Sequence, residues 1–257
     1  MPLPVAFEVR VVGGRALSPG VREIAFERAD GLPMAFEPGQ WVNLILPAPP
    51  PSPQGDGLAQ PLALKRSYSI ASAPGPSPRF DIAVTRVQGG PGSTYLHEVP
   101  AGTALQCIGP QGFFTRPASF ALPSLFIATG TGVTPMRSML QAAVAAAQTA
   151  LEVPIWLLFG VRREVDVLYA AEMQAIAREH PAVRFLPTLS QAGSDWTGRR
   201  GYVQAHVKEL WVQLAALGAG LPHAYICGLE RMVGSVREIL RTDLGLPRQQ
   251  VHSERYD

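Results

Sequence analysis

The stretch Ser124–Leu140, SLFIATGTGVTPMRSML, joins a short apolar run to a glycine-containing turn and the start of a helix. The run Leu125–Ala128 has the length and composition of a buried strand. Gly130 and Gly132, on either side of Thr131, allow the backbone to turn tightly and to approach a ligand closely. The sequence therefore predicts a buried strand that ends in a tight turn.

A helix is predicted directly after this turn. Thr134 is a good N-cap, Pro135 suits the first helical position, and Met136–Ala147 contains no helix breaker. The free N–H groups and the positive end of the helix dipole would then face an anion above the turn. A plain strand-to-helix turn is the alternative, because the loop matches neither a P-loop nor the usual G-x-G-x-x-G pattern.

After Pro123, strands and helices alternate, which predicts a doubly wound parallel sheet. Further strands are expected at residues 155–159, 184–187, 224–227 and near 251, with helices at 168–179, 203–214 and 231–241. Ligands of such sheets bind at the carboxyl ends of the strands. Glu172, Glu179 and Glu209 are predicted to lie on solvent-exposed helix faces.

The first half of the chain contains short strands separated by Gly, Pro and Ser, which predicts an antiparallel barrel or sandwich. The expected strands are residues 7–12, 21–27, 40–46, 67–71, 80–87 and 104–108. The Pro-rich segment 47–63 is predicted to be an exposed, mobile loop. Two domains are therefore expected, at residues 1–118 and 119–257.

Composition narrows the class of protein. The chain has 257 residues and a net charge of +2, which gives no general case for nucleic-acid binding. Its two cysteines, Cys107 and Cys227, are too few for a disulfide framework, a zinc site or a four-cysteine cluster. The start of the chain does not read as a signal peptide and no 18-residue apolar run occurs. A soluble cytoplasmic protein without a metal site or membrane partner is expected.

The strand around Lys65–Ser72, KRSYSIAS, carries an unusual set of polar side chains. Arg66 and Tyr68 share one strand face, and Ser67 and Ser69 share the other. An arginine beside an aromatic ring can hold a phosphate while the ring supports a flat ligand. The alternative is an ordinary edge strand with a half-buried tyrosine.

The chain resembles the ferredoxin–NADP+ reductase superfamily in two motifs that follow one another in the same order. These motifs are Arg66-x-Tyr68-Ser69 and Gly130-Thr131-Gly132-x-x-Pro135. Further matches follow the order of that family over nearly the whole chain. They are Pro38-Gly39-Gln40, Gly92-Ser93-x-x-Leu96, Gly109-Pro110-x-Gly112-x-Phe114 and Cys227-Gly228. The resemblance implies an FAD-binding barrel followed by an NAD(P)-binding α/β domain.

The resemblance also implies roles in flavin binding. Arg66 would contact the flavin pyrophosphate, Tyr68 would lie against the isoalloxazine ring, and Ser69 would sit near its reactive N5. Ser67 belongs to the same motif and is counted with the cofactor-binding residues. The helix start at Gly92, Ser93 and Thr94 would bind phosphate through its backbone, with a simple N-cap as the alternative for Ser93.

The nicotinamide dinucleotide would place its pyrophosphate over the turn that contains Gly130, Thr131, Gly132 and Pro135. The 2′-phosphate of NADP needs cations and hydroxyl groups. Ser190, Arg199, Arg200 and Tyr202 occupy the corresponding region, although Gln191 stands where NADP-selective members often have an arginine. NADP is preferred over NAD on this basis, with a solvated loop as the alternative for the two arginines.

Cys227-Gly228 would lie beside nicotinamide C4, where Cys227 shapes the hydride path and attacks nothing. The ending Glu254-x-Tyr256 resembles plant-type members of the family, whose terminal aromatic residue covers the flavin, although Asp257 adds one residue. Glu254 is predicted to hold or relay a proton near N5. The alternative is a frayed terminus.

These inferences predict an FAD-dependent oxidoreductase that exchanges a hydride with NADP(H). Single electrons would pass to a separate ferredoxin or flavodoxin, because the chain lacks the cysteines for its own cluster. One alternative is an NADH-dependent reductase component of an oxygenase system. Another is an electron-transfer flavin subunit with no nicotinamide activity of its own.

Overall fold

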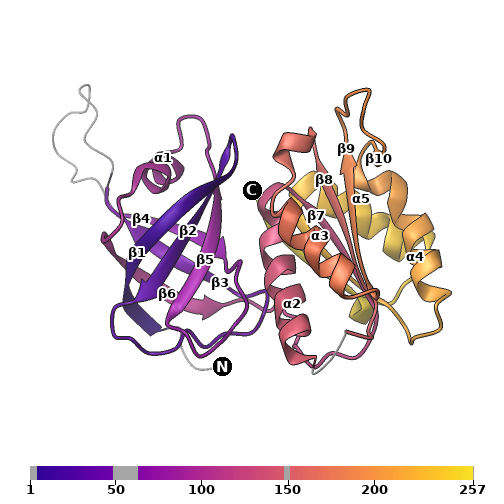
Figure 1. The fold of residues 1–257 in the computed structure, drawn as a ribbon, viewed down its shortest axis with the longest axis horizontal. Coiled ribbons are helices and arrows are strands. Elements are labelled where there is room, and N and C mark those ends of the chain that lie inside the picture. The colour runs from indigo at the N-terminus through magenta and orange to yellow at the C-terminus, as the bar shows by residue number, and fades with distance from the viewer. Residues whose placement is uncertain (1–4, 49–62, 148–150, 257) are drawn as a thin grey trace.

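The computed structural model describes residues 5–48, 63–147 and 151–256, which form two sheets that lie side by side along the molecule (Figure 1). The predicted fold class is confirmed: a six-stranded antiparallel sheet precedes a parallel sheet covered by helices. The expected domain boundary at residue 118 falls in the connection between Gln111 and Ser124, the ends of these two units. Most of the Pro-rich loop prediction lies outside the described residues.

The antiparallel sheet curls into a partly closed barrel. Its strands are β1 (Val5–Ser18), β2 (Val21–Arg28), β3 (Trp41–Leu46), β4 (Leu64–Ser69), β5 (Arg79–Thr85) and β6 (Ala104–Gln111), in the order β4-β3-β6-β1-β2-β5. The Ala71 amide donates to the Asp81 carbonyl at 2.7 Å, which brings the two edge strands together. Apolar side chains that alternate along the strands, such as Val9 and Val11 of β1, fill the interior. Helix α1 (Pro91–Glu98) follows β5.

The second sheet is parallel throughout. Its strands are β7 (Ser124–Thr129), β8 (Ile155–Val161), β9 (Val183–Leu189), β10 (Arg199–Arg200), β11 (His223–Leu229) and β12 (Val251–Tyr256), in the order β10-β9-β8-β7-β11-β12. The chain runs outward from β7 to β9 and then returns to β11 on the other side of β7. Ligands bind where the strand order reverses in this way, so the ends of β7 and β11 mark the expected site.

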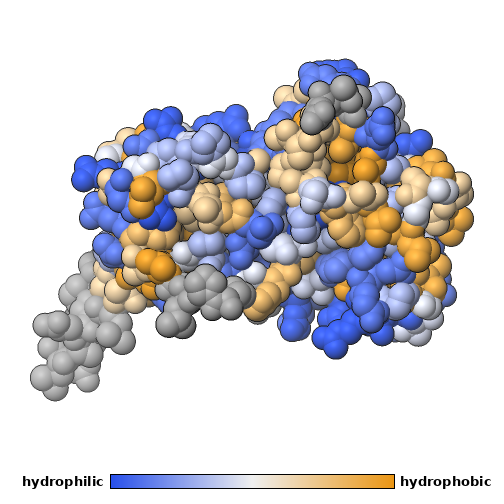
Figure 2. All heavy atoms as spheres, turned by 90° about the horizontal axis from the view of Figure 1, so that it is seen from below, coloured by the Kyte–Doolittle hydropathy of each residue, from blue (hydrophilic) through white to orange (hydrophobic). Residues whose placement is uncertain are grey.

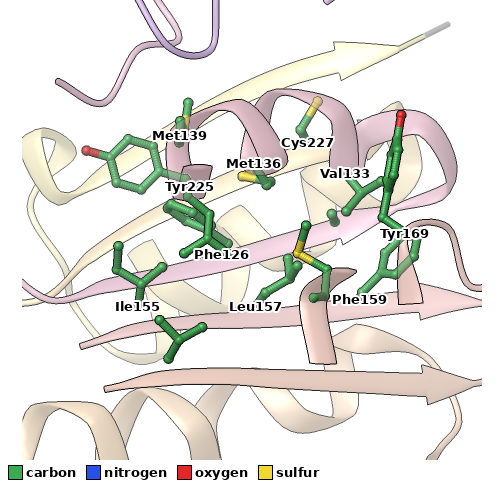
Figure 3. Close-up of a cluster of buried hydrophobic side chains, with 14 of the residues drawn as sticks. Phe126, Val133, Met136, Met139, Ile155, Leu157, Phe159, Tyr169, Tyr225 and Cys227 are labelled. Carbon is green, nitrogen blue, oxygen red and sulfur yellow. The ribbon is translucent and has the colours of Figure 1, made fainter. Parts of the chain in front are cut away.

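Helices cover both faces of this sheet because successive strand residues point to opposite sides. Phe126 of β7 packs with α2 (Val133–Ala146) and α3 (Ala170–Glu179), and Figure 3 shows part of this cluster. Leu125 and Ile127 pack on the other face with α4 (Val207–Ala215) and α5 (Glu230–Glu238). Two buried faces explain why β7 reads as a continuous apolar run.

The start of α2 corrects one prediction. Thr134 is not the N-cap, because Gly130–Gly132 already form a 3₁₀ turn and α2 begins at Val133 with Gly132 as its N-cap. The Thr134 hydroxyl instead donates to the Thr131 carbonyl at 2.8 Å and stabilises this turn. Pro135 still lies within the first turn, where a missing N–H group costs no intrahelical hydrogen bond.

No helix in the described ranges of the chain is long and apolar enough to cross a membrane. Hydrophilic and hydrophobic residues are interspersed over both domains on the face seen in Figure 2.

Candidate functional site

The C-terminal strand brings the two domains together. β12 pairs in parallel with β11, and the register sets Glu254 opposite Cys227 and Tyr256 opposite Leu229. The end of the chain consequently lies between the barrel and the α/β domain (Figure 1). The tail is therefore an ordered edge strand, and the alternative of a frayed terminus is wrong for Glu254 and Tyr256.

Ser69, at the end of β4, is the residue of the barrel that meets this tail. Its hydroxyl donates to Glu254 Oε1 at 3.1 Å and accepts a hydrogen bond from the Tyr256 hydroxyl. The Tyr256 hydroxyl also lies 3.3 Å from Thr134 Oγ1 in the first turn of α2. A short chain of hydroxyl groups thus connects the flavin-motif strand to the predicted nucleotide-binding turn.

Burial controls the protonation of the groups at this junction. It raises the pKa of Glu254 to about 7, although the hydrogen bond from Ser69 works in the opposite direction. Burial also raises the pKa of the Tyr256 phenol well above its usual range, so the phenol is a neutral donor. Burial also raises the pKa of the Cys227 thiol well above its usual range. Glu254 is therefore the group of this junction that can change its charge near neutral pH.

Gly132 and the Cys227-Gly228 pair approach each other closely. A Cβ atom on Gly132 would lie 2.2 Å from the Cys227 carbonyl oxygen and 2.8 Å from the Gly228 amide nitrogen. A Cβ on Gly228, whose φ is +149°, would meet Thr129 Oγ1 at 2.2 Å. Glycines at these positions let the turn after β7 contact the end of β11 directly. Cys227 itself is fully buried, toward the same end of the cluster in Figure 3 as Val133 and Tyr169.

The turn after β7 has features that fit a bound nucleotide. Gly130 has a φ of +53° and open space where a side chain would be. Thr129 Oγ1 is buried and has no hydrogen-bond partner among the described residues. An unsatisfied buried hydroxyl is costly, and a ligand over the turn would supply a polar partner.

A second candidate anion site lies at the start of α1. The first helical hydrogen bond runs from Thr94 N to the Gly90 carbonyl at 3.0 Å, which leaves the amides of Gly92 and Ser93 without helical partners. A Cβ on Gly92 would lie 3.2 Å from Cγ of Arg66, so the arginine stem passes directly over this helix start. The Ser93 hydroxyl is already bonded to Val87 N and Gly90 O, both at 3.0 Å. It is not an N-cap, since Gly90 occupies that position.

The remaining side chains of the flavin motif have different surroundings. Tyr68 is half-buried against the barrel core, and burial raises the pKa of its phenol to about 12. The Ser67 hydroxyl donates to Asn43 Oδ1 on β3 at 2.9 Å. The structure thus places Arg66 beside the start of α1, Tyr68 against the barrel core, Ser69 at the domain junction, and Ser67 against β3.

The two arginines predicted to read a 2′-phosphate are both engaged. Arg199 donates to both carboxylate oxygens of Glu209 at 2.9 Å, and Arg200 donates to backbone carbonyls of the preceding loop, including that of Trp196 at 2.6 Å. Ser190 is held through its amide by the Val161 carbonyl at 3.0 Å, and the Tyr202 side chain is 72 % exposed. These four residues lie near one sheet edge, but neither arginine is free of competing partners.

Arg162 is a further candidate for the 2′-phosphate site that the sequence reasoning did not consider. It follows the end of β8, and its carbonyl accepts a hydrogen bond from the Gln191 amide at 2.8 Å, so it lies beside the position where the expected arginine is absent. Its exposed side chain makes no hydrogen bond or ion pair with any described residue. Its position directly after a parallel strand was the signal that could have identified it.

The residues present therefore fit a flavin dinucleotide across the start of α1 and β4, and a second dinucleotide over the turn after β7. Within the described part of the chain, no group of three or more His, Cys, Asp or Glu side chains could hold a metal ion.

Comparisons with known proteins agree with the binding of a flavin and a nicotinamide dinucleotide. A family model described as an oxidoreductase FAD-binding domain matches residues 10–115, and one described as an oxidoreductase NAD-binding domain matches residues 126–238. The chain is 55 % identical over 252 residues to ferredoxin–NADP reductase B of Sorangium cellulosum, covering 98 % of each chain.

More distant relatives carry other names. The chain is 26 % identical to the phenol hydroxylase P5 protein of Acinetobacter pittii, covering 97 % of this chain and 65 % of that protein. Among solved structures, a ferredoxin–NADP+ reductase from Plasmodium falciparum superimposes with a TM-score of 0.75 at 21 % identity, covering 98 % of this chain and 96 % of the other. The structural similarity supports the fold.

Proposed function

Because this chain belongs to the ferredoxin–NADP+ reductase superfamily, we propose that it exchanges a hydride with NADP(H) and single electrons with a separate ferredoxin or flavodoxin. It is an oxidoreductase with an FAD-binding and an NAD-binding domain. The identity of the nicotinamide cofactor and of the electron carrier is the proposal. It is supported by the relative that is 55 % identical and is named a ferredoxin–NADP reductase.

One observation supports the proposed chemistry more than any other. The Tyr256 hydroxyl donates to Ser69 on the flavin-motif strand and lies 3.3 Å from Thr134 Oγ1, beside the turn that would bind the nicotinamide dinucleotide. FAD held by these residues would supply the chemistry that couples two-electron hydride transfer to single-electron transfer. The protein has to bring the two ring systems together and to exclude water.

The side chains then have separate tasks. Arg66 and the start of α1 bind the flavin phosphates, Tyr68 supports the ring, and the turn at Gly130–Gly132 binds the second dinucleotide. Ser69 and Glu254, which are hydrogen bonded at 3.1 Å, would hold a proton beside the bound flavin, and a carboxyl group that titrates near neutral pH is needed to exchange it there. The pKa of about 7 of Glu254 meets this requirement.

An anaerobic spectral titration of the purified holoprotein tests the proposal. We expect NADPH to bleach the flavin absorbance at lower concentrations than NADH, and a ferredoxin or flavodoxin to reoxidise it. A flavin that stays oxidised with both nucleotides would identify an electron-transfer subunit and refute the proposal.

Arg199 and Arg200 are both hydrogen bonded to other protein groups, so neither is free to bind a 2′-phosphate. This favours a second candidate function, an NADH-dependent reductase component of an oxygenase system. Relatives at 29–30 % identity are named reductase components of monooxygenases. In that case NADH would reduce the flavin at least as well as NADPH in the same titration.

Replacing Arg162 with alanine is expected to raise the KM for NADPH by roughly tenfold to a hundredfold, the equivalent of one lost charge-assisted hydrogen bond. The KM for NADH should change less than twofold, because NADH has no 2′-phosphate. Arg163→Ala is the matched control, since that neighbour is also exposed and its partner is Asp166. Steady-state kinetics with both nucleotides measures the effect, and equal losses for both would show that Arg162 does not read the phosphate.

Replacing Tyr256 with serine is expected to tighten nicotinamide binding about twofold to tenfold and to change the flavin spectrum. An aromatic ring stacked on the flavin contributes about 0.5–1.5 kcal/mol, which a nicotinamide ring must overcome to take its place. Tyr256→Phe is the control, because it keeps the ring but loses the contacts with Ser69 and Thr134. Titration with NADP+ measures the affinities. If the Tyr256→Ser variant has the same flavin spectrum and the same affinity for NADP+ as the wild type, Tyr256 does not cover the flavin.

A further inference from the structure

Arg137 is a buried charged residue that the proposed chemistry leaves unused. It lies in α2, one helical turn after Thr134, and it is only 7 % exposed. Residues three apart on a helix share one face, so Arg137 projects from the same side as the residue that contacts Tyr256. A buried guanidinium is expensive unless it is paired, and its partners therefore indicate what it does.

Within its own domain, Arg137 contacts α3. Its Nε atom lies 2.9 Å from both carboxylate oxygens of Glu172, and the guanidinium stacks 4.5 Å above the centre of the Tyr169 ring. Gln141, one turn further along α2, donates to the same Glu172 carboxylate at 2.7 Å. Glu172 is therefore half-buried and hydrogen bonded to α2, so the prediction of a solvent-exposed helix face holds for it only in part.

Across the domain junction, the same guanidinium holds the barrel. Nη1 donates to the Ala71 carbonyl at 3.0 Å, and it lies 3.8 Å from Glu23 Oε1 and 3.7 Å from Asp81 Oδ2. Gln141 adds a second link, because its Oε1 accepts a hydrogen bond from the Ala73 amide at 2.9 Å. Helix α2 is thus bonded to the segment that directly follows β4.

Carboxylates from both domains surround this arginine. Glu23 Oε1 is buried and has no hydrogen bond within the described structure. Burial and the adjacent Glu23 raise the pKa of Asp81, whereas Arg137 lowers it. Without Arg137, the carboxylates of Asp81 and Glu172 would lose their ion-pair partner, whereas Glu23 would keep Arg15, whose Nε lies 2.5 Å from its Oε2.

Ala71 lies two residues beyond Ser69, and Arg137 lies one turn beyond Thr134. We propose that Arg137 is a positioning residue that fixes the nucleotide-binding helix α2 against the end of the flavin-binding strand β4, and so sets the distance between the two ring systems. This inference rests on the proposed hydride exchange between nicotinamide and flavin. Small displacements of reacting groups have large effects on rate, so a rigid link at this point controls transfer more than binding.

Lysine cannot replace this arginine. The guanidinium directs Nε toward Glu172 and Nη1 toward Ala71 at the same time, whereas an ammonium group is a single point of charge on a flexible stem. Arg137→Lys keeps the charge and loses the rigid two-way link. Glu172→Gln keeps the shape of the partner and loses its charge.

The test measures hydride transfer and backbone protection in the FAD-loaded protein. For Arg137→Lys and Arg137→Met we expect the limiting rate of flavin reduction by NADPH, with a primary deuterium isotope effect, to fall at least tenfold. The dissociation constants for FAD and NADPH should change less than threefold. Hydrogen exchange at the Ala73 amide, which Gln141 holds, should accelerate at least tenfold in both the loaded and the FAD-free protein. Arg178→Met, on the exposed side of α3, should leave all four quantities unchanged.

The outcomes separate the two proposals. Wild-type reduction rates or wild-type exchange at Ala73 in the Arg137 variants would overturn the positioning role. If Arg137→Met does not fold, the reduction rate and the exchange at Ala73 are measured for Arg137→Lys and Glu172→Gln instead. If NADPH and NADH fail to reduce even the wild-type flavin, the proposed function fails, while accelerated exchange at Ala73 would still support the link between the domains.

Discussion

Replacing Gly132 with alanine is expected to lower the melting temperature by roughly 6–12 °C and to abolish nicotinamide binding, while the barrel still binds FAD. The added Cβ would lie 2.2 Å from the Cys227 carbonyl oxygen and 2.5 Å from its carbonyl carbon. Overpacking costs about 1–3 kcal/mol where side chains can move aside. Here the obstacle is the backbone of β11, so we expect the upper end of that range or more.

The functional loss follows from the same contact. To make room, the start of α2 must move away from β11, and the turn with Thr131 and Thr134 moves with it. Three measurements on the same variant separate the effects on the two domains. Thermal unfolding reports stability, NADP+ titration reports binding by the α/β domain, and FAD titration reports binding by the barrel.

Gly234→Ala is the matched control for this experiment. Gly234 is exposed in the middle of α5, and a Cβ there meets no atom within 4 Å. Alanine should leave binding unchanged and raise stability by about 0.4–1 kcal/mol, because it restricts the unfolded chain. A Gly132→Ala protein that melts and binds NADP+ like the wild type would show that the close approach is dispensable.

Local pattern was sufficient to predict the fold. The apolar run Leu125–Ala128, the glycine turn and the alternation after Pro123 each depend on neighbouring residues, and the structure confirms the parallel sheet they indicate. The predicted start of α2 was wrong because two helix-start signals compete. Thr134 is a good N-cap by composition, but the glycines already turn the chain into helical geometry before it.

The domain junction could not be predicted from the sequence. Arg137 looks like an ordinary polar residue of an amphipathic helix, and its partners include barrel residues more than fifty positions away, such as Ala71 and Asp81. The tail was predicted as a site on resemblance, yet its partners Ser69 and Thr134 became visible only when both domains were placed. Long-range contacts of this kind have no local signal.

Replacing Arg66 with alanine is expected to weaken FAD binding by roughly tenfold to a hundredfold, the loss of one charge-assisted contact worth about 1.5–3 kcal/mol. The Arg66 stem lies over Gly92, with Nε 3.5 Å from the position of a Cβ there, and Nη1 donates to the Lys65 carbonyl at 2.9 Å, so the guanidinium lies close to the start of α1. Cation, amides and the positive end of the helix dipole together favour a phosphate group. Titration of the FAD-free protein, followed by quenching of flavin fluorescence, measures the affinity.

Two variants distinguish a specific contact from general charge. Arg66→Lys keeps the charge but loses the planar fork, so its affinity should lie between those of wild type and Arg66→Ala. Lys65→Ala removes the neighbouring exposed charge, whose side chain points to the opposite strand face, and should bind FAD like the wild type. The Arg66 effect should also shrink as salt concentration rises, because exposed charges are screened. Equal losses for Lys65→Ala and Arg66→Ala would mean that the strand attracts FAD only through its overall charge, and that Arg66 makes no particular contact with the pyrophosphate.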